Sequence, residues 1–547
     1  MGFQPMQAAR KPRASHTTRE SKPGIWEFVF RIGQWASRAV SRFSAWAGSP
    51  CHGGLARCVL AVGALLGFSD IARAADAPAP TEADYYKIIK IPIPDSVILE
   101  CGGLEWMPDG RLAVSTRRGD IYMVENPTAP NVRRIRFAKW ATGMHEVMGL
   151  AYNKKDGYLY AIQRGEITRL KDTDGRGYAS VYETFCDDWG ISGDYHEYPW
   201  MSKFDKDGNL WVMLTLTGSF TSDARFRGWC LRVTPEGTII PTASGIRSPD
   251  GIVFNDKGEA FYDDNQGPWQ GGDNFNYLEP GKFMGHPIGN KWYDLAPNMH
   301  PKPIDPVSGS RMWTEAQRIP QYNPPAVVQP YEKVGQSGSG IVFDSSAGKF
   351  GPFAGQFFAG DQHHSNLNRI GIEKVKGYYQ GWVTRFREGF SSGNVPALQA
   401  PDGSVFIGGT ARGWGSVGGK DYALERVVWT GKVPFEVLDM HVAPDGFDLS
   451  FTQPVNKEIA GNARSYDLPT FTYIYREQYG SPEVDQTQCK ITKATVSDDG
   501  KKVHLTVEGM VQGHIHELHM SDLRSADGLP LLHSTIWYTL WNIPDAK

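Results

Sequence analysis

One alternation of apolar and polar positions recurs between residues 85 and 429. Each unit is an apolar strand, a polar turn that contains glycine, and a second strand rich in aromatic residues. The clearest unit is IVFNDKGEAFYDD (252–264), and alternating runs around such a turn are typical of antiparallel strands. The other units are GGLEWMPDGRLAVST (102–116), GLAYNKKDGYLYAI (149–162), MSKFDKDGNLWVML (201–214), GIVFDSSAGKFGPFAGQFFAGD (340–361) and VPALQAPDGSVFIGG (395–409).

These repeats predict an all-β protein that begins with a six-bladed β-propeller over residues 85–431. The inner strands are almost continuously apolar, as expected for blades that pack against a neighbour on both faces. We expect residues 85–93 to pair into the last blade and close the ring. Beyond residue 431 the pattern changes to short alternating strands with Asp-Gly turns, which predicts an immunoglobulin-like β-sandwich over residues 432–547.

The N-terminus has the pattern of an export signal. Residues 58–68 form a short apolar run, and an A-x-A cleavage site ends at Ala74. We therefore expect residues 1–74 to be an N-terminal extension with a signal peptide, residues 75–84 to be a linker, and the protein to be secreted or periplasmic. The run is shorter than the roughly 20 residues of a permanent transmembrane span, and an N-terminal anchor is the alternative.

Composition agrees with this interpretation. The 547 residues exceed one ordinary core, and 61 glycines, 36 prolines and 12% aromatic residues indicate many turns and pleated strands. The formal net charge of -3 lacks the basic footprint of a nucleic-acid partner. An oxidising compartment would permit a disulfide, for which Cys186 and Cys230 are the first candidates.

Polar residues gather at equivalent points of successive units, just before the inner strand or just after the second strand. A propeller places these points around the mouth of its central channel, where binding sites are common. The residues are His145, Glu146, His196, Arg247, Ser248, Asp250, Asp264, Asn265, Gln266 and His363. Each one alone is also explained as an ordinary polar residue of a loop, but their recurrence favours a site for acid–base chemistry or a divalent metal.

Five stretches carry a resemblance to a known family. They are DGRLAVSTRRGDIYMV (109–124), HEVMGLAYNKKDGYLYAI (145–162), IRSPDGIVF (246–254), NQGPWQGGDNFN (265–276) and GKFMGHP (281–287). Together they resemble the soluble glucose/sorbosone dehydrogenases, propellers that use pyrroloquinoline quinone (PQQ) and calcium, over residues 100–429. The resemblance implies oxidation of a sugar or polyol hydroxyl at the channel mouth, with a separate electron acceptor as a possible partner.

The resemblance also implies roles for particular residues. His196 precedes FDKDGNLW much as the family's catalytic base precedes the equivalent turn, and it would take the proton of a sugar hydroxyl. Arg247 and Ser248 match a pair that contacts the cofactor, with serine in place of the family's asparagine. Gly267 and Pro268 match the residues whose carbonyl oxygens bind calcium, an ion that prefers oxygen ligands. The other polar residues at the mouth would bind substrate.

Two departures from the family concern the quinone. Gly393 and Val395 stand where the sixth blade of the family has arginines, and residues 360–370 contain no lysine to match that of the fifth blade. Each lost charge-assisted pair removes about 1.5–3 kcal/mol, so PQQ would keep few partners beyond Arg247 unless Arg412 substitutes. Two alternatives therefore stay open: a carbohydrate-active propeller with non-redox chemistry, and a carbohydrate- or protein-binding module without catalysis.

Overall fold

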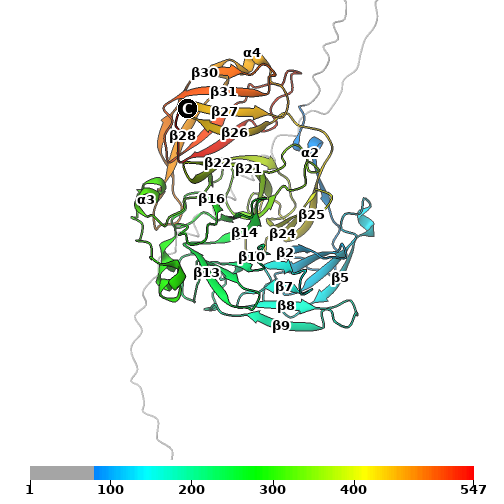
Figure 1. Ribbon diagram of the computed structural model, residues 1–547. Coiled ribbons are helices and arrows are strands. Elements are labelled where there is room, and N and C mark those ends of the chain that lie inside the picture. The colour runs from blue at the N-terminus through cyan, green and yellow to red at the C-terminus, as the bar shows by residue number, and fades with distance from the viewer. Residues whose placement is uncertain (1–78, 547) are drawn as a thin grey trace, which may run out of the picture. The chain divides into compact units, whose positions relative to one another are not determined.

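The computed structural model describes residues 79–546, so the predicted extension and signal peptide (1–74) and the start of the predicted linker lie outside the described residues. The chain of residues 85–429 forms six antiparallel blades of four strands each (Figure 1). Blade one contains β2 (Cys101–Trp106), β3 (Leu112–Thr116), β4 (Ile121–Glu125) and β5 (Arg136–Ala141). Blade two contains β6 (Gly149–Tyr152), β7 (Leu159–Ile162), β8 (Ile167–Lys171) and β9 (Val181–Cys186). Blade three contains β10 (Pro199–Phe204), β11 (Leu210–Leu214), β12 (Trp229–Val233) and β13 (Ile239–Ser244).

The later blades follow the same order. Blade four contains β14 (Pro249–Phe254), β15 (Ala260–Asp264), β16 (Asp273–Tyr277) and β18 (Val327–Gln329). Blade five contains β19 (Gly338–Phe343), β20 (Phe357–Asp361), β21 (Asn366–Val375) and β22 (Tyr378–Arg387). Blade six contains β23 (Asn394–Gln399), β24 (Val405–Thr410), β25 (Tyr422–Trp429) and, from the N-terminal side, β1 (Tyr86–Lys90).

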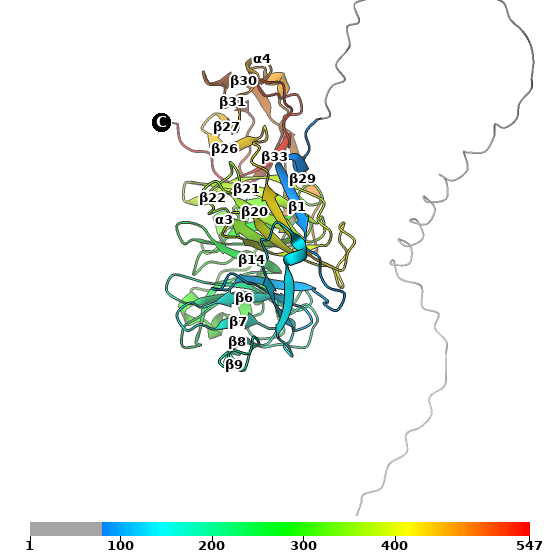
Figure 2. The ribbon, with the colours of Figure 1, turned by 90° about the vertical axis from the view of Figure 1, so that its right-hand side faces the viewer.

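The innermost strands form a closed ring. Strand β2 contacts β6, and the contacts continue through β10, β14, β19 and β23 back to β2. Strand β1 pairs with β25, with Tyr86 opposite Trp429, so the N-terminal strand completes blade six (Figure 2). The predicted propeller and its closure by the first strand are therefore confirmed. Closure leaves no open edge at the join between the first and last blades, which stabilises the ring.

The repeated polar turns have a common local cause. In blade four the Asn255 side chain accepts the N–H of Lys257 at 3.0 Å and that of Glu259 at 2.9 Å, and Gly258 has a positive φ of 77°. An Asn or Asp side chain thus satisfies the backbone inside the turn, while glycine adopts the left-handed conformation that other residues avoid. This arrangement connects β14 to β15 and sets their register, with Phe254 opposite Ala260.

Short helices occupy the connections. They are α2 (Glu82–Tyr85), η2 (Val132–Arg134), η3 (Pro287–Leu295), η4 (Pro297–Met299), α3 (Met312–Arg318), α4 (Lys457–Ala460) and η5 (Ala463–Ser465). In the part of the chain that the structure describes, none of the helices is long and apolar enough to span a bilayer.

The C-terminal strands form two groups. One is a four-stranded sheet of β26 (Val437–Ala443), β27 (Gly446–Phe451), β31 (Lys502–Glu508) and β30 (Lys490–Val496). The other contains β28 (Pro469–Tyr475), β29 (Glu483–Gln488), β32 (His514–His519) and β33 (Thr535–Leu540), with β17 (Ser310–Arg311) at its edge.

The second C-terminal group is continuous with blade five. Strand β33 pairs with β22, with Gly381 opposite Thr539 and Val383 opposite Trp537, and the red strand next to β22 in Figure 1 is β33. A nine-stranded sheet results, and the outer edge of blade five is covered. The boundary expected near residue 431 is thus bridged by strand pairing, and the immunoglobulin-like assignment of residues 432–547 stays a prediction.

The disulfide prediction was wrong. Cys186 ends the outermost strand of blade two, whereas Cys230 lies in the third strand of blade three. Both are buried in separate apolar clusters and both are free thiols. They are small apolar residues of two different layers between blades.

Candidate functional site

A cavity of about 400 Å³ lies where the central channel opens. Its walls are the loops before β10, β14 and β19, the loops after β15, β20 and β24, and one residue of the C-terminal segment. Seven of the residues predicted from the sequence line this cavity. They are His196, Arg247, Ser248, Asp250, Asn265, Gln266 and His363.

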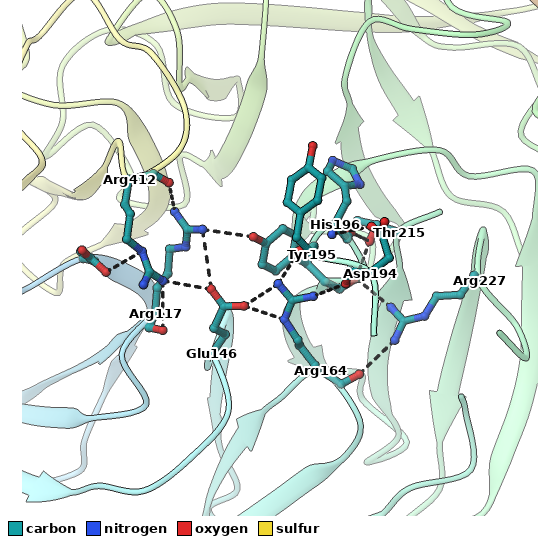
Figure 3. A network of polar contacts seen from close by, with 11 residues as sticks. Arg117, Glu146, Arg164, Asp194, Tyr195, His196, Thr215, Arg227 and Arg412 are labelled. Carbon is teal, nitrogen blue, oxygen red and sulfur yellow. Dashed lines mark hydrogen bonds and ion pairs between the residues drawn. The ribbon is translucent and has the colours of Figure 1, made fainter. Parts of the chain in front are cut away.

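The backbone of His196 is fixed by hydrogen bonds in the loop before β10. Asp194 Oδ1 accepts the N–H of His196 at 2.8 Å and that of Gly218 at 2.9 Å. Thr215 Oγ1 donates to the His196 carbonyl at 2.6 Å (Figure 3). The loop is therefore held from both sides, and the imidazole starts from a defined position at the cavity wall.

The His196 imidazole is neutral at neutral pH. Nδ1 lies 3.3 Å from the Leu216 carbonyl, which can only accept, so Nδ1 carries the hydrogen and Nε2 keeps its lone pair. Ser219 Oγ lies 2.9 Å from Nε2 and 3.0 Å from Nδ1. Burial lowers the pKa of His196 to about 4, and the positive charge of Arg247 adds to this. The group can thus accept a proton from a hydroxyl placed at Nε2.

Arg247 is held at the cavity wall by its backbone. Its N–H donates to Asp264 Oδ2 at 2.9 Å, and the N–H of Ser248 donates to Asp264 Oδ1 at 2.7 Å. Asp264 itself is fully buried behind the wall, so it positions the loop and does not face the cavity. The Arg247 guanidinium lies against Gly267, because a Cβ at that position would be 2.0 Å from Arg247 Nε. Only glycine leaves room for the guanidinium there.

Two further residues of the cavity wall, Asp250 and Trp200, have polar atoms without a hydrogen-bond partner. Asp250 is 5% exposed, accepts from Asn265 Nδ2 at 3.2 Å through Oδ2, and has no partner at Oδ1. Burial raises the pKa of Asp250 well above its usual range, which favours the neutral acid. The indole Nε1 of Trp200 is also buried without a partner. Buried polar atoms without partners at a cavity wall are suited to bind a polar ligand.

The predicted calcium ligands do not fit a metal. The Gly267 carbonyl already accepts the N–H of Gln270 at 3.1 Å and that of Gly480 at 3.0 Å, so both lone pairs are used. Pro268 forms a β-bridge with Tyr479. Across residues 79–546, moreover, no group of three or more His, Cys, Asp or Glu residues is arranged to hold a metal ion.

His145 and Glu146 lie outside the cavity. Glu146 Oε2 accepts from Arg164 Nε at 2.5 Å, Oε1 accepts from Arg412 Nη2 at 3.0 Å, and Arg117 Nη2 lies 3.6 Å from Oε1 (Figure 3). The Glu146 carboxylate therefore neutralises arginines of neighbouring blades. It does not contact the space where a substrate would sit.

This ionic network supports the His196 loop. Arg164 Nη1 donates to the Asp194 carbonyl at 2.8 Å, and Nη2 donates to the Tyr195 carbonyl. Arg412 Nε also lies 3.0 Å from Glu100 Oε2, so Arg412 is paired with two carboxylates. It is therefore not free to replace the missing arginines of the quinone site.

The residues around the cavity do not fit PQQ. Among the described residues that line it, Arg247 is the one arginine or lysine. One guanidinium would face three quinone carboxylates in a cavity that also holds the Asp250 carboxyl. Buried charges without counter-charges are strongly unfavourable. We therefore derive no step through the quinone.

Several lining residues were not predicted from the sequence. They are Tyr331, Gln336, Gln362 and Tyr479. Gln362 directly precedes the predicted His363, so the sequence pattern pointed to within one residue of it. Tyr479 carried no signal, because it lies beyond the propeller and reaches the cavity only through the tertiary fold.

Comparisons with known proteins give matches among solved structures alone. Neither a scan against family models nor a search of curated proteins finds a match. Solved structures do match. The PQQ-bound aldose sugar dehydrogenase of Streptomyces coelicolor is 18% identical, with 64% of this chain and 99% of that chain covered and a TM-score of 0.46.

Other solved structures give similar values. The apo aldose sugar dehydrogenase of Escherichia coli is 14% identical, with 62% of this chain and 99% of that chain covered and a TM-score of 0.42. The PQQ domain of a pyranose dehydrogenase from Coprinopsis cinerea is 11% identical, with 65% and 99% covered and a TM-score of 0.44. The structural neighbours are thus PQQ-dependent sugar dehydrogenase propellers, over about 63% of the chain. This likeness concerns the fold, and the chemistry has to come from the residues of this chain.

Proposed function

We propose that the cavity binds a sugar or related polyol and that His196 accepts the proton of one of its hydroxyl groups. The observation that carries this proposal is the meeting of His196, Arg247 and Asp250 with amide side chains and aromatic rings around one cavity. Hydroxyl groups need paired donors and acceptors, and the C–H faces of a sugar ring need flat apolar surfaces. The cavity offers both.

Exposed aromatic rings at the cavity support a carbohydrate ligand. Tyr195, Phe220 and Tyr479 are 66%, 53% and 54% exposed, and all three line the cavity. Phe220 and Tyr479 come from distant parts of the chain, yet their ring centres are 6.0 Å apart. Exposed apolar surface gathered in one cavity marks a ligand-binding site. A sugar ring stacked on these aromatic rings would cover part of that surface.

The proton transfer uses His196 Nε2. A substrate hydroxyl that displaces Ser219 Oγ from its position 2.9 Å from Nε2 would donate its proton to that lone pair. The Leu216 carbonyl, 3.3 Å from Nδ1, would then stabilise the imidazolium that forms. A positioned general base of this kind contributes about 10²–10⁴-fold to a rate.

A second candidate is oxidation of the bound hydroxyl, as in the sugar dehydrogenases. The specific observation in its favour is that His196 and Arg247, which the family resemblance assigns to base and cofactor, line one cavity. Under this proposal the protein is an exported oxidoreductase with a separate electron acceptor, and its redox cofactor would have to bind without the arginines and free carbonyl oxygens that hold PQQ and calcium in the family. The C-terminal residues would be an accessory immunoglobulin-like domain.

Two measurements test these functions. The purified protein is titrated with neutral and acidic monosaccharides by calorimetry, and failure of all of them to bind would reject a carbohydrate site. The protein is then incubated with PQQ and calcium, and reduction of a dye is followed after sugar is added. Dye reduction that His196→Ala abolishes would establish the dehydrogenase. Sugar binding without dye reduction would leave the non-redox function.

A further inference from the structure

Arg247 is a buried arginine without a counter-charge. Arg247 is 3% exposed. Its Nη1 donates to the Asn265 carbonyl at 3.3 Å, and its Nε is buried without a hydrogen-bond partner. In residues 79–546 no carboxylate lies within 4.0 Å of its guanidinium nitrogens. An unpaired buried charge costs several kcal/mol, so such a group is usually completed by something else.

Other buried arginines have a carboxylate or several carbonyls as partners. Arg164 pairs with Glu146 at 2.5 Å. The Nε atoms of Arg117 and Arg369 are also buried without a partner, but these guanidinium groups lie 3.6 Å from Glu146 and 3.9 Å from Glu436. Arg227 has no carboxylate partner, but its guanidinium donates to the carbonyls of Gly190, Tyr198 and Arg164 at 3.0 to 3.3 Å. Arg247 has one carbonyl partner, at 3.3 Å, no carboxylate within 4.0 Å among the described residues, and it lines the cavity. A further partner is therefore expected inside the cavity.

We propose that Arg247 binds the carboxylate of an acidic sugar, such as a uronic or aldonic acid. This inference rests on the proposed carbohydrate site and names the substrate class. A planar carboxylate can accept from N–H groups of one guanidinium in a paired geometry, and Arg247 lines the cavity in which such a carboxylate would lie. The Tyr479 ring, whose centre is 5.2 Å from the guanidinium carbon, also keeps the arginine in place.

The single positive charge of Arg247 distinguishes between a sugar carboxylate, a sugar phosphate and the quinone as its partner. One guanidinium balances one negative charge, and the neighbouring Asp250 carboxyl would repel any further charge if it ionised. A phosphate ester carries about 1.5–2 negative charges at neutral pH, and the quinone carries three carboxylates. A single carboxylate therefore matches this cavity better than a sugar phosphate or the cofactor.

The test is calorimetric titration of the purified full chain with D-glucuronate, D-glucose and D-glucose 6-phosphate. We expect glucuronate to bind about 10- to 100-fold more tightly than glucose, and Arg247→Gln to bring the two affinities within about threefold of each other. Arg225→Gln is the matched control, because Arg225 pairs with Asp188 outside the cavity. This variant should keep the preference for glucuronate.

A second variant displaces the Arg247 guanidinium but keeps its positive charge. In Gly267→Ala the new methyl group would meet Arg247 Nε at 2.0 Å, so the guanidinium has to move and glucuronate binding should weaken about 10-fold or more. Thermal unfolding without ligand checks that each variant is folded. If Arg247→Gln fails to fold, the unmodified protein tests the proposal alone: tighter binding of glucuronate than of glucose and glucose 6-phosphate supports it, and any other order contradicts it.

The outcomes separate this inference from the proposed function. Equal binding of glucose and glucuronate would overturn the acidic sugar and leave the carbohydrate site standing. No binding of any sugar would overturn both. Tighter binding of the phosphate than of glucuronate, or PQQ binding that Arg247→Gln abolishes, would assign the arginine to another anion and overturn the inference.

Discussion

Replacing His533 with glutamine is expected to lower the free energy of unfolding by roughly 3 kcal/mol at about pH 6 and by little at about pH 10. His533 Nδ1 lies 2.5 Å from Glu436 Oε1, and Nε2 lies 3.1 Å from Glu82 Oε1. Arg387 is 3.2 Å from the Glu82 carboxylate, and Arg369 is 3.9 Å from that of Glu436. This charged cluster joins α2, the segment after blade six and the C-terminal strands.

The magnitude follows from the two protonation states of His533. Burial alone would lower its pKa, but the carboxylates of Glu436 and Glu82 outweigh burial and raise the pKa from 6.5 to about 9. At about 1.36 kcal/mol per pH unit, this rise contributes roughly 3 kcal/mol. Since the pKa is higher in the folded protein, the contribution is complete below pH 6.5 and is lost as the pH rises through about 9.

Urea unfolding from about pH 6 to pH 10 measures this difference, because urea is uncharged and does not screen the cluster. His504→Gln is the control. His504 pairs at the surface with Asp445 and Asp448, and such pairs contribute about 0–1 kcal/mol. A stability difference for His533→Gln that stays constant over this range, or grows as the pH rises, would refute the assignment of a charged imidazole.

Three further predictions concern the cavity and its support. His196→Asn should lower the rate at which a bound sugar reacts about 10²–10⁴-fold, with the free energy of unfolding unchanged. In the unmodified protein the same rate should fall as the pH drops through about 4, because protonation of His196 removes the base. Tyr479→Ala should weaken sugar binding by roughly 0.5–1.5 kcal/mol in calorimetry, with unfolding unchanged. Glu146→Gln should lower the free energy of unfolding by about 3–5 kcal/mol, because Arg164 and Arg412 lose the carboxylate between them. An effect below about 1 kcal/mol would show that water already solvates these arginines.

The propeller could be predicted because its signals are local. A turn such as residues 255–258 is closed by its own Asn and Gly, and it sets the register of the two strands beside it. Each blade can therefore be predicted from a short stretch of sequence. Closure of the ring by residues 85–93 could be expected because an alternating apolar strand precedes the first unit.

The site was predictable in part for the same reason. His196, Arg247 and Asp250 occupy equivalent points of successive units, and the fold brings them to one cavity. His145 and Glu146 occupy such points too, but nothing local shows that three arginines surround Glu146. Ion pairs between blades depend on side chains far apart in sequence, so the sequence cannot tell a substrate ligand from a buried counter-charge.

In the loop of residues 265–270, the C-terminal segment contacts the Gly267-Pro268 motif that was predicted to bind calcium. Gly480 donates its N–H to the Gly267 carbonyl at 3.0 Å, and the Arg476 carbonyl accepts from Trp269 at 2.7 Å, so protein groups satisfy oxygens and amides that an ion or water would otherwise contact. The same segment places Tyr479 against Arg247. The C-terminal segment thus occupies the position predicted for calcium and adds an aromatic residue to the cavity wall. Gly267 leaves room for the Arg247 guanidinium, so in this protein the glycine is explained by the arginine beside it and not by an ion.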